Sequence, residues 1–369
     1  MPPEPQPAAP APPRERLLFI DGLRCIAVLW VVLSHFIHNS PFEEFFSDFL
    51  PPLLYRACWK GSLGVAIFFV ISGFVIALSL ARDRVTPRFA LGFAVRRYVR
   101  LFPPYIAVVF LWIATTALGK IIFPSYDLPQ PSGAQLAAHF LYLQNLLGLG
   151  DIVGPTWTLC LEFQFYLFYA LCALLVLARS RPVRITGILL FAAATLASIS
   201  LTAFSVPAEG LLESKRLFVR TWYLFALGTL GTLAYLRPRT RRWMPLPLLV
   251  GALIWAHCRS EALLVGLAAF AAILLAAVLG RMGAWLSNPV IQYFGSRSYS
   301  IYLVNWGVGL RFIDMIHRFA PQNLLSAWLC TLAGFAVTLA VSELLYRLLE
   351  KPSLRLSQRL KPFFAEGPK

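Results

Sequence analysis

The chain has 369 residues, of which 58% are hydrophobic and only 14% are charged, and its mean hydropathy is +0.68. Soluble globular domains carry about 25% charged residues, so this composition excludes that class and predicts an integral membrane protein. A formal net charge of +16 would suggest a nucleic-acid partner in a soluble protein. Here the cations lie between apolar runs, so loop orientation explains the charge better and we expect no nucleic-acid binding. The six cysteines form no CxxC motif and no His/Cys cluster, so we expect neither a disulfide framework nor a metal site.

Residues 1–15 are rich in Pro and Ala and predict a disordered cytoplasmic tail. The apolar run 17–38 that follows is long enough to span a bilayer, yet it carries Asp21, Arg24 and His35. Arg24 and His35 are eleven residues apart, so in a helix they point the same way, about 16 Å apart. Asp21 precedes Arg24 by one turn and can pair with it. Ionisable groups inside a membrane usually line a cavity or a pathway. The alternative is that Asp21 and Arg24 form an ordinary ion pair at the helix end and that His35 lies at the membrane interface without a functional role.

Further apolar runs predict an all-α polytopic fold with about ten transmembrane helices. Alternating the loops between the two sides places 23 Lys and Arg on one side and nine on the other. The cytoplasmic side carries the excess, so both termini are predicted to be cytoplasmic. Residues 16–360 then form one transmembrane domain, and 361–369 form a cytoplasmic tail. The expected spans are 17–37, 62–81, 101–119, 157–178, 185–206, 219–236, 245–258, 261–279, 298–317 and 323–347.

Glu162 is expected about a turn and a half below the outer membrane boundary, at a depth similar to that of His35. Two titratable groups at matching depth in separate spans suggest an acid/base pair. A hydrogen bond that merely joins two helices is the alternative for Glu162. The external segment 119–156 contains an apolar piece after Ala137 that is too short to span the membrane, which predicts an interfacial or re-entrant helix. A segment of this length is expected to be either a lid over the acceptor side or a simple connector.

The run FAVRRYVRLFPPY, residues 93–105, places Arg96, Arg97 and Arg100 at the cytoplasmic face, with Arg96 and Arg100 on one helical side. Guanidinium groups match phosphate oxygens in bidentate fashion, although simple positive-inside anchoring is the alternative. Pro103 and Pro104 are expected to shape the entry to the next span.

These polar groups predict a column that begins with arginines at the cytoplasmic mouth and ends with His35 and Glu162 near the outside. A ligand with a phosphate head and a thin reactive tail fits such a column. Acyl-coenzyme A is a molecule of this kind, and its pantetheine arm has the length required.

The chain resembles the membrane-bound acyltransferase-3 family in an ordered set of segments that covers residues 16 to 360. The terminal segment LLYRLLEKPSLRL, residues 344–356, is also typical of the family. The matching segments are FIDGLRCIAVLWVVLSHF (19–36), FFVISGFVI (68–76), RRYVRLFPPY (96–105), TWTLCLEFQFYL (156–167) and FGSRSYSIYLVNW (294–306).

The resemblance implies that His35 is the catalytic residue, that Arg24, paired with Asp21, is essential, and that Glu162 belongs to the active site. It also implies acyl-donor contacts for the arginines of the RRYVR segment, and we expect the membrane domain to act alone. Many relatives have a histidine where this chain has Asn305, so a proton role there is in doubt. The expected donor contacts are Arg96, Arg97, Arg100 and Arg24, and weaker substrate contacts are expected from Trp157, Tyr299 and Asn305.

The expected function is therefore an O-acyltransferase of the inner (cytoplasmic) membrane. It would move an acyl group, most simply acetyl, from cytoplasmic acyl-CoA to a hydroxyl of an extracytoplasmic or membrane-associated glycan or small molecule. His35 would act as general base or briefly carry the acyl group. A proton-coupled transporter also keeps His, Glu and Arg inside the membrane and is the alternative, although no inverted repeat is visible. A membrane scaffold or sensor would not explain the polar column.

Overall fold

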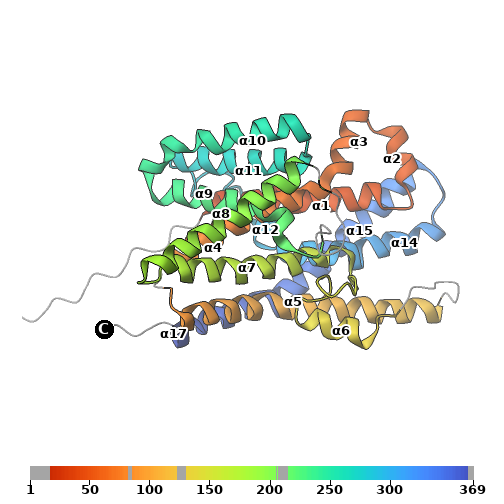
Figure 1. Cartoon of the computed structure of the whole chain (residues 1–369). Helices are drawn as coiled ribbons and strands as arrows, with labels where there is room; N and C mark the ends of the chain where they lie inside the picture. Colours follow the sequence, from red (N-terminus) through yellow and green to blue (C-terminus); the bar gives the residue numbers. More distant parts are fainter. Residues whose placement is uncertain (1–16, 82–84, 123–129, 205, 207–214, 365–369) are drawn as a thin grey trace, which may run out of the picture.

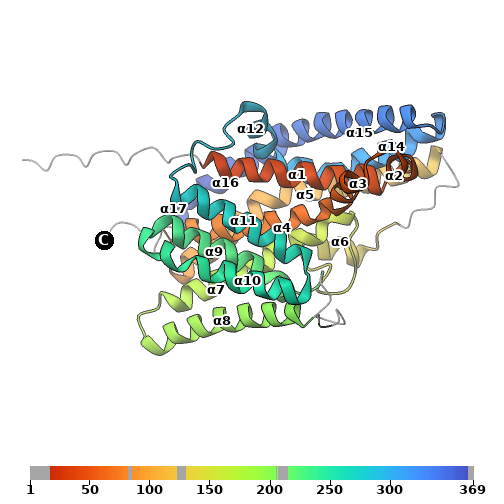
Figure 2. The ribbon, with the colours of Figure 1, turned by 90° about the horizontal axis from the view of Figure 1, so that it is seen from above.

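The computed structural model describes residues 17–81, 85–122, 130–204, 206 and 215–364, and within these ranges it contains helices and turns but no β-strand. The long helices lie roughly alongside one another in two perpendicular views (Figures 1 and 2). The all-α polytopic fold predicted from the sequence is thereby confirmed. The start of α1 and the helix α17 lie at the same end of the bundle (Figures 1 and 2). The predicted tail 1–15 lies outside the described residues.

Seven helical segments of the described chain are long and apolar enough to cross a membrane. They contain the helices α1 (Leu18–His38), α4 (Gly64–Leu80), α5 (Pro87–Ile122), α7 (Trp157–Val176), α8 (Arg181–Ala203), α11 (Glu261–Val278) and α15 (Leu324–Leu345).

The three other predicted spans also coincide with helices, but these helices are shorter or composite. Helix α9 (Trp222–Leu236) has 15 residues and α10 (Pro245–Cys258) has 14. At about 1.5 Å per residue, neither reaches the roughly 30 Å of a hydrocarbon core. The last of the three joins α13 (Ser298–Val304), a π-helical turn (Asn305–Leu310) and α14 (Arg311–Ile316).

Short helices connect these segments and extend them at both ends of the bundle. The π-helical turn Tyr346–Glu350 joins α15 to α16 without a break. The connecting elements are α2 (Glu43–Phe49), α3 (Pro52–Trp59), α6 (Gly133–Phe140), α12 (Pro289–Ser296), α16 (Lys351–Arg359), α17 (Lys361–Phe364) and the 3-10 turns Lys60–Leu63, Gly154–Thr156, Phe218–Thr221, Pro238–Trp243 and His317–Phe319.

Helices α4 and α9 cross at the centre of the bundle with their backbones in close contact. A Cβ atom on Gly73 would lie 2.0 Å from the Phe225 carbonyl oxygen, and one on Gly228 would lie 2.0 Å from the Val70 carbonyl oxygen. Because glycine has no side chain, Gly73 and Gly228 allow the two helix backbones to approach this closely, as is common in membrane bundles.

Replacing Gly73 with alanine is expected to lower the melting temperature of the detergent-purified protein by several degrees. The added methyl group meets backbone atoms, which cannot rotate away, and overpacking of this kind costs about 1–3 kcal/mol. Gly133→Ala is the matched control, because no atom lies within 4 Å of a Cβ placed there. Equal melting temperatures for the two variants would contradict the close contact of α4 and α9.

Helix α5 runs for 36 residues and continues through Pro103 and Pro104. The predicted span 101–119 therefore begins too late, because the arginine run and the span form one helix. The arginines are consequently held on the same rigid element as the apolar segment.

The external segment contains a shorter helix than its apolar pattern predicts. Helix α6 ends at Phe140, and Tyr142, Gly148 and Gly150 have positive φ angles. A positive φ ends a right-handed helix, so the residues after Leu141 form turns rather than a re-entrant helix. The short helix itself is capped by Ser132, whose hydroxyl accepts a hydrogen bond from the backbone N–H of Gln135 at 3.1 Å.

Candidate active site

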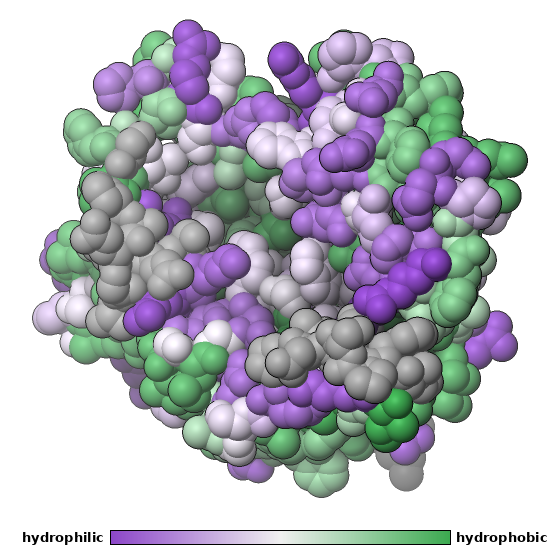
Figure 3. Space-filling model, turned by 90° about the vertical axis from the view of Figure 1, so that its right-hand side faces the viewer, coloured by the Kyte–Doolittle hydropathy of each residue, from purple (hydrophilic) through white to green (hydrophobic). Residues whose placement is uncertain are grey.

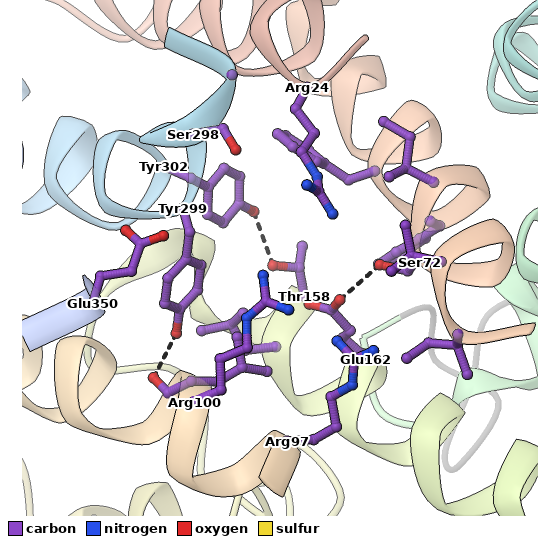
Figure 4. Close-up of a pocket in the computed structure, with 18 of the residues that line it drawn as sticks. Arg24, Ser72, Arg97, Arg100, Thr158, Glu162, Ser298, Tyr299, Tyr302 and Glu350 are labelled. Carbon is purple, nitrogen blue, oxygen red and sulfur yellow. Dashed lines mark hydrogen bonds between the residues drawn. The ribbon is translucent and has the colours of Figure 1, made fainter. Parts of the chain in front are cut away.

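A central cavity of about 320 Å³ lies among helices α1, α4, α5, α7 and α13. Figure 4 shows that Arg24 from α1, Arg97 and Arg100 from α5 and Glu162 from α7 all point into it. Two helices that are distant in sequence, α1 and α5, thus bring three guanidinium groups into the central cavity. This arrangement confirms that Arg24 and two members of the arginine run converge.

The three arginines differ in how many of their donors the protein already uses. Arg24 donates to the Asp21 carboxylate at 3.0 Å, which is the pair predicted one turn apart on α1. The Arg97 guanidinium lies over the rings of Phe93 and Tyr166, 5.3 and 5.1 Å from their centroids. Neither Arg97 nor Arg100 makes a hydrogen bond or ion pair with another described residue. Their N–H groups are therefore available to an anionic ligand.

The two glutamates of the cavity, Glu162 and Glu350, are held by hydroxyl groups. Glu162 accepts hydrogen bonds from Ser72 at 2.7 Å and from the Tyr166 hydroxyl. Glu350 accepts one from Ser300 at 2.5 Å. These bonds fix Glu162 and Glu350 on the cavity wall without engaging the donors of Arg97 and Arg100.

His35 lies in a second space, the distal cavity, of about 360 Å³ at the C-terminal end of α1. Its Nδ1 lies 2.5 Å from Asn305 Oδ1, and its ring makes an edge contact with Trp306 at 4.8 Å between centroids. Seen from this end of the bundle, the molecular surface is hollowed near its centre, and many hydrophilic side chains surround the hollow (Figure 3). The distal cavity is further lined by Ser34, His38, Asn39, Trp59, Lys60, Ser62, Leu63 and Glu261.

The structure does not bring Glu162 to His35, so the predicted pairing of these two residues is wrong. Glu162 faces Ser72 and the arginines of the central cavity, whereas His35 faces Asn305. Glu162 lines the same cavity as Arg24, whereas His35 lies eleven residues further along α1 and lines the distal cavity.

A wall made of Phe68, Thr158 and Tyr302 borders the central cavity on the side toward His35. The Tyr302 hydroxyl and Thr158 Oγ1 lie 2.9 Å apart, and the Phe68 and Tyr302 rings meet edge to face at 5.8 Å. Asn305, which contacts His35, follows Tyr302 by about one turn. The segment from Tyr302 to Asn305 therefore contributes to the central cavity at one end and contacts His35 at the other.

Of the remaining predicted site residues, only Tyr299 lines one of these two cavities. Tyr299 lines the central cavity and donates its hydroxyl to the Leu101 carbonyl oxygen at 2.7 Å. Arg96 is not among the lining residues, and its guanidinium lies over the Phe89 ring at 5.3 Å. Trp157 lines neither cavity, and Asn305 is fully buried behind His35.

Sequence reasoning missed Ser72 and Tyr166 as partners of Glu162. Tyr166 follows Glu162 by four residues, which places both on one helical side, so the spacing carried a usable signal. Ser72 belongs to another helix, and no spacing rule connects it with Glu162.

A family model described as an acyltransferase domain matches residues 17–347. The chain is 29% identical to "Acyltransferase MdmB" of Streptomyces mycarofaciens, with 95% of both chains covered. It is 27% identical to "Putative membrane-bound transacylase BcsY" of Komagataeibacter xylinus, covering 94% of this chain and 85% of that protein. Identity to "Putative O-acetyltransferase SACOL0978" of Staphylococcus aureus strain COL is 25%, over 90% of this chain and 56% of that protein. No solved structure matches.

Proposed function

Because the chain belongs to the acyltransferase-3 family and is a multi-pass membrane acyltransferase, we propose that it transfers an acyl group, most simply acetyl, from acyl-CoA to a hydroxyl group. The donor enters from the cytoplasm and the acceptor, a glycan or small molecule, from the other side. Since the donor is cytoplasmic, the protein would reside in the inner (cytoplasmic) membrane.

The observation that carries the proposal is the convergence of Arg24, Arg97 and Arg100 in one cavity. Arginine binds phosphate through a rigid fork of N–H donors, and two of these three arginines have no protein acceptor among the described residues. A CoA pyrophosphate supplies the acceptors. Asp21 orients Arg24, and Glu162 balances positive charge beside Arg97.

The distal cavity suits the acceptor because it places His35 against a polar space that holds two tryptophans, a lysine and a glutamate. One of the relatives is named as an O-acetyltransferase, which supports a hydroxyl as the acceptor group. The reactive end of the donor must then cross the wall of Phe68, Thr158 and Tyr302. A thin pantetheine arm is the part of CoA that fits such a passage.

The chemical step requires a base and a leaving group. The acceptor oxygen bonds to the thioester carbonyl carbon while its proton passes to Nε2 of His35. The C–S bond then breaks, and the CoA sulfur takes up that proton. In the alternative route, Nε2 itself attacks the thioester carbonyl, and the acyl-imidazole then transfers its acyl group to the hydroxyl.

The test is release of CoA from acetyl-CoA by the purified protein in nanodiscs. CoA should be quantified by chromatography rather than with a thiol dye, because the protein has six free cysteines of its own. Slow release is expected with water as acceptor, and faster release when a hydroxyl-bearing acceptor such as an oligosaccharide is added. Absence of both CoA release and acetyl-CoA binding by calorimetry would overturn the proposal and favour a transporter.

A further inference from the structure

Asn305 occupies a special place in the backbone. It is fully buried, and it begins the π-helical turn Asn305–Leu310 that interrupts the run from α13 to α14. π-Helical turns inside longer helices are frequently found at functional sites. The residue contacts His35 across 270 positions of sequence.

Hydrogen bonding fixes which end of the Asn305 amide faces His35. Its Nδ2 donates to the carbonyl oxygens of Ile301 at 3.1 Å and Tyr302 at 2.7 Å. Turning the amide over would place its oxygen against two carbonyl oxygens, so only one orientation satisfies all four groups. Oδ1 therefore faces His35 Nδ1 at 2.5 Å.

This orientation determines where His35 carries its proton. An amide oxygen only accepts hydrogen bonds, so Nδ1 must be the donor. In a neutral imidazole, a proton on Nδ1 leaves the lone pair on Nε2. No described residue makes a hydrogen bond to Nε2, and the ring lines the distal cavity.

We propose that Asn305 is a positioning residue that holds neutral His35 as the Nδ1–H tautomer and so presents Nε2 to the acceptor in the distal cavity. This inference rests on the proposed function for its catalytic consequence. When Nε2 accepts a proton, Nδ1 keeps its hydrogen bond to Oδ1, so the ring need not rotate between the two states. A neutral amide thus performs the orienting task that a carboxylate performs in many histidine bases.

Two variants test the role of Asn305. Asn305→Leu removes the acceptor at similar volume, and kcat for CoA release should fall about tenfold to a hundredfold, as for other partners that orient a catalytic histidine. The KM for acetyl-CoA should stay within twofold of wild type, because the central cavity is untouched. Asn305→Asp keeps an oxygen for Nδ1 but sets its second oxygen against the carbonyl oxygens of Ile301 and Tyr302. It should therefore retain more activity than Asn305→Leu while having a lower melting temperature than wild type. Unchanged kcat in Asn305→Leu would overturn the proposal.

The tautomer itself can be measured without any donor. Histidine-selective ¹⁵N labelling distinguishes protonated from unprotonated ring nitrogens, and the five histidines allow His35 to be assigned from the spectrum of His35→Gln. The wild type should show the proton on Nδ1, and Asn305→Leu should show a mixture of tautomers. A proton on Nε2 in wild type, or an unchanged tautomer in Asn305→Leu, would contradict the proposal. The Nδ1–H tautomer without any CoA release would instead refute the acyltransfer from CoA and leave the role of Asn305 in fixing the ring standing.

Discussion

Replacing His35 with glutamine or alanine is expected to lower kcat for acyl transfer by about a hundredfold to ten-thousandfold, the usual contribution of a positioned general base. His35 is the histidine of the described chain that lies in a polar cavity with its Nδ1 bonded and its Nε2 directed to no protein group. Removing it leaves the acceptor hydroxyl without a base, while the arginines still bind the donor. The KM for acetyl-CoA should therefore change little.

The matched control for this substitution is His257→Ala. His257 is exposed at the end of α10 and lines neither cavity, so its loss should leave CoA release within twofold of wild type. Because His35→Gln keeps most of the side-chain volume, agreement between the glutamine and alanine variants would exclude a packing effect. Full activity in either variant would remove His35 from the mechanism.

The same variants distinguish the two chemical routes. With radiolabelled acetyl-CoA and no acceptor, an acyl-imidazole leaves label on wild-type protein and none on His35→Gln. Direct transfer leaves neither protein labelled. Ping-pong kinetics accompany the first route.

Spacing along a single helix was sufficient to predict part of the site. The separation of Asp21 and Arg24 by three residues predicts their pairing, and the structure contains that pair at 3.0 Å. The separation of Arg24 and His35 by eleven positions predicts two polar side chains about 16 Å apart on one helix, and the structure places them in two different cavities. Local geometry depends on the sequence alone, so it can be derived before any tertiary contact is known.

Contacts between helices were not predictable in the same way. Glu162 lines the same cavity as Arg24 rather than that of His35, and its carboxylate meets Ser72 and Tyr166. The rotation of a buried helix depends on all its neighbours, and α7 is apolar on most sides, so its sequence carries little information about which side faces which partner. The contact of His35 with Asn305 is unpredictable for the same reason.

The orientation of α5 decides which arginines of the run enter the central cavity. Helical spacing groups Arg96 with Arg100, four residues apart, whereas the structure groups Arg97 with Arg100 in the central cavity. Residues three and four apart both lie on neighbouring positions of a helix surface, so spacing alone does not choose between them. The choice is made by α7, whose Tyr166 lies against Arg97, and by Phe89, over which Arg96 lies.

Arg97→Gln and Arg100→Gln should each raise the KM for acetyl-CoA about tenfold to a hundredfold, because a hydrogen bond to a charged group contributes about 1.5–3 kcal/mol. Arg96→Gln removes the same charge from the same helix outside the cavity, so its KM should rise by less than threefold. The melting temperature of each variant shows whether the helix remains intact.

The donor's own phosphates provide the decisive comparison. S-acetylpantetheine carries the thioester without the phosphates, so wild type should use it with a much higher KM than acetyl-CoA. With this donor, Arg97→Gln and Arg100→Gln should cause almost no further loss, because the groups they bind are already absent and the two changes are then not additive. An equal loss with both donors would show that these arginines stabilise the fold or the reacting group instead. An effect of Arg96→Gln as large as that of its neighbours would mean that the positive charge of the run, rather than the cavity, attracts the donor.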